Sequence, residues 1–373
     1  MTKERPTIAV RLPHWLGHSS SIWHGLRESA TVEGGWRFVV NRDKTLGELP
    51  SEVVDHRWRG DGVITFRMTQ EEGDAWHAAG IPVVNLSSEG PSPHAPRILP
   101  DNERVGWLAA QHLLDLKLEH VAFLGRITSQ HTDAVMAPGL RRVYSEERQR
   151  GFEEACKRRG CSPRAHLLPG RDLSQSLAWK EIRQEVADFL ASLPRPCGIF
   201  AADDLLALVA IYAAESLGAR VPQDFPIVGF GNDPEYCLTS TPALSSVVYP
   251  GEEVGRKAAG LIAKLISGQD ASLDSTRVVV SRVMSRESSA YYPAGDPEFA
   301  QVMDYIRRQA PGRPLKVSEL ADLVPYGMTA LKRRFHQKVG HGPKQQIDQV
   351  RAGRLKELLL GTELSLNEIA DSM

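Results

Sequence analysis

Short apolar runs alternate with amphipathic helical windows from residue 5 to about residue 290, and this alternation constrains the fold more than any other feature. Strands that alternate with helices form a parallel sheet that helices cover on both faces. The region is long enough for two such lobes. The predicted strands are TIAVRL, WRFVVN, DGVITF, IPVVNL, HVAFLG, CGIFAA, PIVGFG and LSSVVY, and the predicted helices cover residues 102–117, 147–159, 177–193 and 204–217.

Polar residues directly after predicted strands are the first candidates for a binding site. In an open parallel sheet the ligand crevice lies at the carboxyl ends of the strands. Asp203 and Asp204 follow CGIFAA at the start of a helix, and we assign Asp203 to the ligand and Asp204 to a structural role such as helix capping. Asn232 follows IVGFG, and Asp101 follows RILP, where it either contacts a ligand or caps the next helix.

An octet repeats near the end of the chain, as VSELADLV at residues 317–324 and LNEIADSM at residues 366–373. In both copies the apolar residues have the i, i+3, i+4, i+7 spacing of one helix face. A small alanine within this stripe lets a second helix approach closely, as a helix-turn-helix requires. Ser365 and Glu368 form the S-x-x-E pattern of a capping box before the second copy. The repeat therefore predicts two tandem helix-turn-helix units.

A basic helix follows the first octet. Pro325 and Gly327 interrupt the chain, and residues 328–339 then start a new helix. An isolated basic run is usually a solvated helix face, but after a helix-turn-helix it favours contacts with phosphates and bases in a DNA major groove. The predicted DNA contacts are Thr329, Lys332, Arg333 and His336 on the outer face of this helix, with Arg334 beside them.

The composition is that of a globular protein of two or three domains, with 373 residues, 42% hydrophobic and 24% charged. The formal net charge of −1 gives no overall attraction for nucleic acid, so the basic signal is local. The chain has four cysteines, which form no C-x-x-C pair, and we expect buried free thiols. We expect no metal site and no cofactor.

The N-terminus lacks the apolar core of a signal peptide, and no stretch approaches the roughly 18–20 apolar residues that span a bilayer. We therefore expect a cytoplasmic protein without a membrane partner. The chain has no G-x-x-x-x-G-K phosphate loop and no G-x-S-x-G elbow. Because adjacent carboxylates at a helix start cannot both face one substrate, Asp203 and Asp204 do not form an acid–base pair. We do not expect an enzyme.

Three resemblances cover most of the chain. Residues from about 298 onward resemble the AraC-type DNA-binding domain, in LKRRFHQKVGHGP and RAGRLKELLLGTELSLNEIADSM. Most of residues 60–290 resemble the effector-binding core of the LacI/GalR family, in ILPDNERVGWLAAQHLLDL, EERQRGFEEACKRRG and CGIFAADDLLALVAIYAAESLG. This order of domains, with WRGDGVITF and VVSRVMSRESS, resembles the xylose-responsive XylR subgroup of activators. The sequence ends before the second reading helix of AraC-type domains, so we expect weak DNA binding by these residues.

The resemblance implies a two-lobed, periplasmic-binding-protein-like α/β domain with parallel sheets, followed by an all-α tandem helix-turn-helix domain whose second unit is incomplete. We expect the first domain at residues 1–290 and the second at residues 291–373. The expected N-lobe covers about 5–118 and 244–272, and the expected C-lobe covers about 119–243 and 273–290.

The resemblance also implies a sugar effector, D-xylose or a related pentose. Arg148 matches the arginine of the family's R-x-x-G-F motif, which reaches sugar hydroxyls, although it could be one more charge on a solvated helix start. Asp203 aligns with a cleft-facing polar residue of the family. The family usually has an aspartate where this chain has Gly231, and Asn232 is the nearest substitute. Trp15 is the expected aromatic platform for the sugar ring.

We therefore expect a sugar-responsive activator that binds double-stranded operator DNA as a homodimer, with RNA polymerase as a further partner. The alternative is a truncated sugar-binding sensor without effective DNA binding. Affinity for operator DNA distinguishes the activator from the sensor, because the sensor binds sugar but not an operator.

Overall fold

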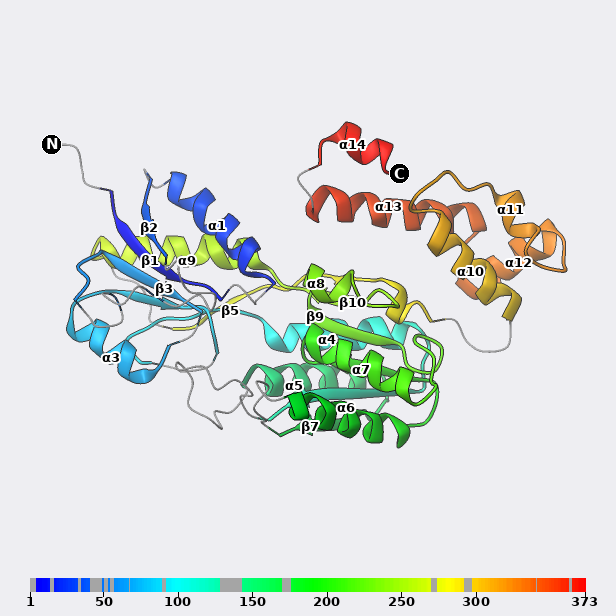
Figure 1. Cartoon of the computed structure of the whole chain (residues 1–373), viewed down its shortest axis with the longest axis horizontal. Helices are drawn as coiled ribbons and strands as arrows, with labels where there is room; N and C mark the ends of the chain where they lie inside the picture. The colour runs from blue at the N-terminus through cyan, green and yellow to red at the C-terminus, as the bar shows by residue number, and fades with distance from the viewer. Residues whose placement is uncertain are drawn as a thin grey trace. The chain divides into compact units, whose positions relative to one another are not determined.

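The computed structural model separates the chain into two compact units, Met1–Tyr291 and Tyr292–Met373. Figure 1 shows the α/β elements of the first unit and the helices of the second. The structure describes residues 5–13, 17–32, 35–40, 49, 53, 57–66, 68–88, 92–127, 143–169, 176–269, 274–291, 297–339, 341–361 and 364–373.

The first lobe of the α/β unit is a parallel sheet with strand order β2-β1-β3-β4. Successive side chains of a strand point to opposite faces, so Ile8 and Val10 pack under α1 and α9 while Ala9 packs on the side of α3. The elements are β1 Thr7–Arg11, α1 Ser19–Val32, β2 Arg37–Val39, β3 Gly62–Thr65, α3 Gln70–Ala78, β4 Val83–Asn85 and α9 Gly251–Ile266.

The second lobe is a sheet of order β12-β10-β9-β8-β6-β7, parallel except for the β10–β12 pair. Phe123 and Phe200 pack on the face that α4 and α5 cover, and Leu124 and Ile199 pack on the face of α6 and α7. The elements are α4 Asn102–Asp115, β6 His120–Arg126, α5 Val143–Arg158, β7 Arg164–Leu168, α6 Ser176–Ala191, β8 Cys197–Ala201, α7 Asp204–Ser216, β9 Ile227–Gly231, α8 Pro234–Cys237, β10 Ser245–Val248, β12 Val283–Met284 and the 3-10 turn Glu287–Ser289.

The chain crosses between the lobes after β5 (Ile98–Pro100), after β10 and after β11 (Thr276–Val278). Strands β5 and β11 pair with each other in parallel. Helix α4 packs against α5, where a Cβ atom on Gly106 would lie 1.9 Å from the carbonyl oxygen of Arg148. The second lobe therefore begins with α4 and includes β10. The sequence analysis instead placed residues up to about 118, and residues 244–272, in the first lobe.

The second unit is a small helical domain around Phe299, Leu320, Leu331 and Phe335. The first octet buries Leu320 and the second buries the equivalent Ile369, whereas Leu366 at the start of the second octet exposes 73% of its surface. No helix in the described part of the chain is long and apolar enough to cross a membrane. The helices are α10 Pro297–Gln309, α11 Val317–Ala321, α12 Met328–Val339, α13 Pro343–Gly361 and α14 Leu366–Asp371.

The predicted fold class is confirmed. Each predicted apolar run contains an observed strand, and the four helical windows coincide with α4, α5, α6 and α7. The predicted capping box is also present, because the backbone N–H of Ser365 donates to the Glu368 carboxylate at 2.8 Å and the Glu368 N–H donates to the Ser365 hydroxyl at 3.4 Å.

Candidate ligand-binding site and DNA-contact face

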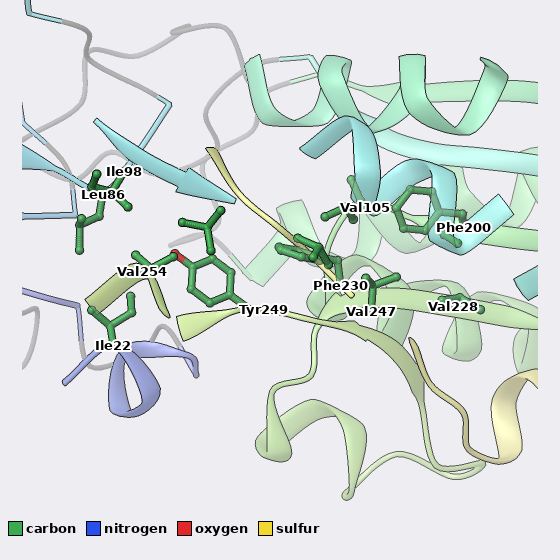
Figure 2. Close-up of a cluster of buried hydrophobic side chains, with 14 of the residues drawn as sticks. Ile22, Leu86, Ile98, Val105, Phe200, Val228, Phe230, Val247, Tyr249 and Val254 are labelled. Carbon is green, nitrogen blue, oxygen red and sulfur yellow. The ribbon is translucent and has the colours of Figure 1, made fainter. Parts of the chain in front are cut away.

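One apolar cluster continues across the junction of the two lobes. Figure 2 shows Tyr249 and Phe230 between Ile22 of the first lobe and Phe200 of the second. Tyr249 directly follows β10, at the second crossing, and Phe230 lies near the carboxyl end of β9. The junction therefore brings aromatic rings to the carboxyl ends of the strands, where the candidate polar residues also lie.

Arg148 lies on α5 at this junction and is only 6% exposed. Its Nη1 donates to the carbonyl oxygen of Ala202 at 2.5 Å, and its Nε donates to Asn102 Oδ1 at 3.0 Å. The guanidinium lies 3.9 Å from the ring centre of Phe230 and 4.5 Å from that of Tyr144. Burial lowers the pKa of Arg148 to about 10, which leaves it charged at neutral pH. The structure thus places a charged, buried arginine here, and the solvated-helix reading of Arg148 is wrong.

The Asp203 carboxylate makes two contacts within the second lobe. It caps α7, where its Oδ1 accepts the Leu206 N–H at 2.8 Å, and its Oδ2 accepts Arg126 Nε at 3.0 Å. Burial opposes ionisation of Asp203, but the charge and hydrogen bonds of Arg126 outweigh it and lower the pKa of the carboxyl. Asp203 is therefore an ionised carboxylate whose side chain remains 26% exposed. The sequence analysis did not single out Arg126, which ends β6.

Asp204 is buried and has a structural role, although Asp203 and not Asp204 is the helix cap. Its Oδ1 accepts the Ser246 hydroxyl at 2.6 Å, and its Oδ2 accepts the Asp233 N–H at 2.9 Å. Burial raises the pKa of Asp204 to about 6 against these hydrogen bonds. The carboxyl joins the start of α7 to the ends of β9 and β10.

Gly231 and Asn232 both have positive φ angles, 132° and 55°. A Cβ atom on Gly231 would lie 3.0 Å from Asp204 Oδ2, so the aspartate common in the LacI/GalR family would be strained here. Asn232 Oδ1 accepts Arg286 Nη2 at 2.8 Å, and its N–H donates to Ser246. Asn232 is thus already bonded within its own lobe.

Asp101 is the N-cap of α4, because its Oδ1 accepts the Arg104 N–H at 3.0 Å. Its own N–H donates to the carbonyl of Val278 at 2.9 Å, which ties the first crossing to the third. The capping alternative is therefore confirmed for Asp101. Trp15, the predicted platform, lies outside the described residues.

His18 and Tyr249 form a stacked pair that the sequence analysis did not predict. Their ring centres are 3.7 Å apart at an angle of 18°, and Phe66 lies 5.9 Å from His18. His18 Nε2 and the Tyr249 hydroxyl are buried and have no hydrogen-bond partner among the described residues. Burial, together with the charge of Arg148, lowers the pKa of His18 to about 3, so its ring is neutral at physiological pH.

Backbone from the first lobe contacts the second lobe beside this pair. The Gly17 N–H donates to the Asp233 carboxylate. A Cβ atom on Gly17 would lie 1.9 Å from the carboxyl carbon of Asp233, so only glycine permits this approach. Among the described residues, no group of three or more His, Cys, Asp and Glu could hold a metal ion, and the cysteines are free.

The outer face of α12 in the helical unit is exposed as predicted. Leu331 and Phe335 are buried in the core. Arg334 differs from its neighbours, because its guanidinium lies 4.0 Å from the ring centre of Tyr326 and is half-buried. The exposed residues of this face are Thr329, Lys332, Arg333 and His336.

Comparison with known proteins identifies the family of the chain. Residues 110–289 match the periplasmic binding protein-like domain. The xylose operon regulatory protein of Haemophilus influenzae is 30% identical over 279 residues, which cover 75% of this chain and 68% of that protein. The chain belongs to the family of xylose operon regulatory proteins. The predicted XylR-type resemblance is confirmed.

Solved structures of other regulators have a similar fold. The xylose-binding transcription activator XylR has a TM-score of 0.65 at 24% identity, over 100% of this chain and 92% of that protein. A LacI family regulator of Enterococcus faecium with bound ribose has a TM-score of 0.57 at 23% identity, over 76% of this chain and 98% of that one. These relatives are transcription regulators, which agrees with the prediction that the chain is not an enzyme.

Proposed function

We propose that this family member is a sugar-responsive transcription regulator that binds D-xylose or a related pentose at the junction of its lobes. The observation that carries the proposal is the buried Arg148 next to two unpartnered polar atoms, His18 Nε2 and the Tyr249 hydroxyl. Buried polar groups without partners are costly and rare in native proteins. A sugar hydroxyl both donates and accepts, so a pentose can satisfy all three groups while its C–H faces contact aromatic rings.

The predicted site residues then divide by role. Arg148 donates to sugar oxygens, and the partly exposed Asp203 carboxylate, held by Arg126, accepts sugar hydroxyls. Asp101 caps α4 and Asn232 is bonded to Arg286, so in this proposal both are secondary contacts of the sugar beside Arg148 and Asp203. Trp15 stays a proposed platform from the segment after β1.

Calorimetric titration of the full chain with D-xylose, L-arabinose, D-ribose and D-glucose tests this proposal. We expect saturable binding of D-xylose that Arg148→Met abolishes. Tyr249→Phe removes a hydroxyl that has no partner among the described residues, so it should keep or raise stability while weakening the binding of D-xylose. Tyr212→Phe, at a ring that is 44% exposed, is the matched control. Absence of binding for all four sugars refutes the proposal.

We further propose that the helical unit binds operator DNA through α12, with Thr329, Lys332, Arg333 and His336 in the major groove and Arg334 as a support stacked on Tyr326. The family and the exposed cationic face support this role.

In this proposal the chain is a homodimeric activator in the cytoplasm, where it meets RNA polymerase. The sugar can change DNA binding only by binding two states of the protein with different affinities. Sugar binding without any affinity for DNA would instead support the sensor that lacks an effective reading domain.

A further inference from the structure

A chain of hydrogen bonds connects a crossing strand to the arginine of the proposed sugar site. Arg277 donates from Nη2 to Glu147 Oε1 at 2.7 Å and from Nη1 to Glu147 Oε2 at 3.2 Å. Asn102 Nδ2 donates to Glu147 Oε2 at 2.9 Å, and Asn102 Oδ1 accepts Arg148 Nε at 3.0 Å. The four side chains form one continuous relay that ends at Arg148.

The members of the relay come from different parts of the fold. Arg277 lies on β11, which leads into the third crossing, and it pairs in register with Leu99 of β5. Asn102 is the first residue of α4, immediately after the first crossing. Glu147 and Arg148 are neighbours on α5 of the second lobe. The relay therefore spans from the strands that join the lobes to the residue proposed to bind the sugar.

The charge of Glu147 sets the direction of every bond in the relay. Burial opposes ionisation of Glu147, but the hydrogen bonds of Arg277 and Asn102 outweigh it and lower the pKa of the carboxyl. A carboxylate only accepts, so the amide of Asn102 must turn its NH2 group to Glu147 and its oxygen to Arg148. Asn102 is 1% exposed and Glu147 6% exposed, so the bond between them is buried, whereas the Arg277 side chain is 44% exposed.

We propose that Arg277, Glu147 and Asn102 are positioning residues, which fix the orientation of Arg148 for the sugar and make it depend on the crossing strand β11. The inference rests on the proposed function, because it assumes that Arg148 contacts the sugar. A change in the angle between the lobes moves β11 relative to α5, and the Arg277–Glu147 pair transmits that movement to the guanidinium.

The chain offers a matched control for the ion pair. Arg150 and Glu103 also join α5 to α4, with Nη2 of Arg150 3.0 Å from Oε1 of Glu103, but both side chains are more than half exposed. Among the described contacts, neither member of this pair bonds to Arg148. Arg150→Met therefore removes an ion pair of α5 and one positive charge near Glu147, but it keeps every hydrogen bond of the relay.

Two readouts on the full chain test the inference. The first is the ¹H–¹⁵N signal of Arg148 Nε–H without sugar, identified by its loss in Arg148→Lys. We expect Glu147→Gln and Arg277→Met to shift this signal and to speed its exchange with water about tenfold. Glu147→Gln lets the Asn102 amide turn, whereas Arg277→Met removes the two hydrogen bonds that hold the Glu147 carboxylate against Asn102. Arg277→Lys should restore it in part, and Arg150→Met should leave it unchanged.

The second readout is calorimetric titration with D-xylose. We expect Glu147→Gln and Arg277→Met each to weaken binding about tenfold, and the double variant to be no weaker than Glu147→Gln alone, since both act through one path. If the wild-type chain binds D-xylose but the variants match Arg150→Met in affinity and in the Nε–H signal, the inference is overturned. If the wild-type chain binds no D-xylose, the proposed function fails, and the Nε–H signal alone decides whether the relay positions Arg148.

Discussion

Substituting Gly106 by alanine should separate α4 from α5 and destabilise the first unit. An added Cβ atom would lie 1.9 Å from the carbonyl oxygen of Arg148 and 2.6 Å from the Phe152 nitrogen, whereas ordinary contacts begin at 3.4 Å. Both neighbours are backbone atoms of a helix, so no side-chain rotation relieves the clash. Overpacking at a site this rigid costs about 3 kcal/mol. Alanine recovers about 1 kcal/mol of helix propensity, which leaves a net loss of about 2 kcal/mol.

Urea unfolding followed by tryptophan fluorescence measures this loss selectively. All seven tryptophans lie before residue 180, so the signal reports the first unit and not the helical one. Gly260→Ala is the control, because Gly260 lies on α9 and a Cβ atom there meets nothing within 4 Å. The control should gain up to about 1 kcal/mol. A Gly106→Ala variant as stable as Gly260→Ala would refute the close packing of α4 on α5.

Three further predictions follow from particular side chains. The pKa of Asp204 is about 6 in the folded protein and 3.8 in its ordinary state, so the unfolded chain loses this proton at lower pH than the folded one. The free energy of unfolding should therefore fall by about 3 kcal/mol as pH rises from about 4 to 6. Urea titrations at pH 4 to 7 should show this fall for the wild-type chain and not for Asp204→Asn. Gly231→Ala should lose about 1–3 kcal/mol to backbone strain at φ 132°, and unchanged stability would contradict that strain. Lys332→Ala and Arg333→Ala should each lower the slope of log affinity for duplex DNA against log salt by about 0.9, while Lys264→Ala on the first unit leaves it unchanged.

The fold could be predicted from local patterns because strands buried on both faces appear as continuous apolar runs. The elements that escaped prediction do not have this pattern. Strand β7 is an edge strand whose first two residues, Arg164 and Ala165, are exposed, and β11 and β12 are only three and two residues long. The position of α4 also escaped, because its lobe is decided by the approach of Gly106 to a helix about forty residues later, which no local pattern encodes.

The proposed site was predictable to the extent that its residues end strands. Arg148 and Asp203 were identified by motif and position, and the structure brings both to the junction of the lobes. Arg126 also ends a strand, so the same rule could have found it. The stack of His18 on Tyr249 could not be found in this way, because it joins segments at opposite ends of the first unit. Its unpartnered polar atoms become visible only when both segments are placed.

The central claim, that sugar binding and DNA binding are coupled in one chain, is tested most directly by measuring D-xylose affinity with and without DNA. The DNA duplex is first selected for binding to the chain from a pool of random sequences, and it is then added at a concentration that saturates the protein. Linkage requires that DNA change the Kd for D-xylose by the same factor by which D-xylose changes the Kd for DNA. We predict a reciprocal change of at least about fivefold, the lower end of typical coupling. Equal D-xylose affinity with and without bound duplex would contradict the claim.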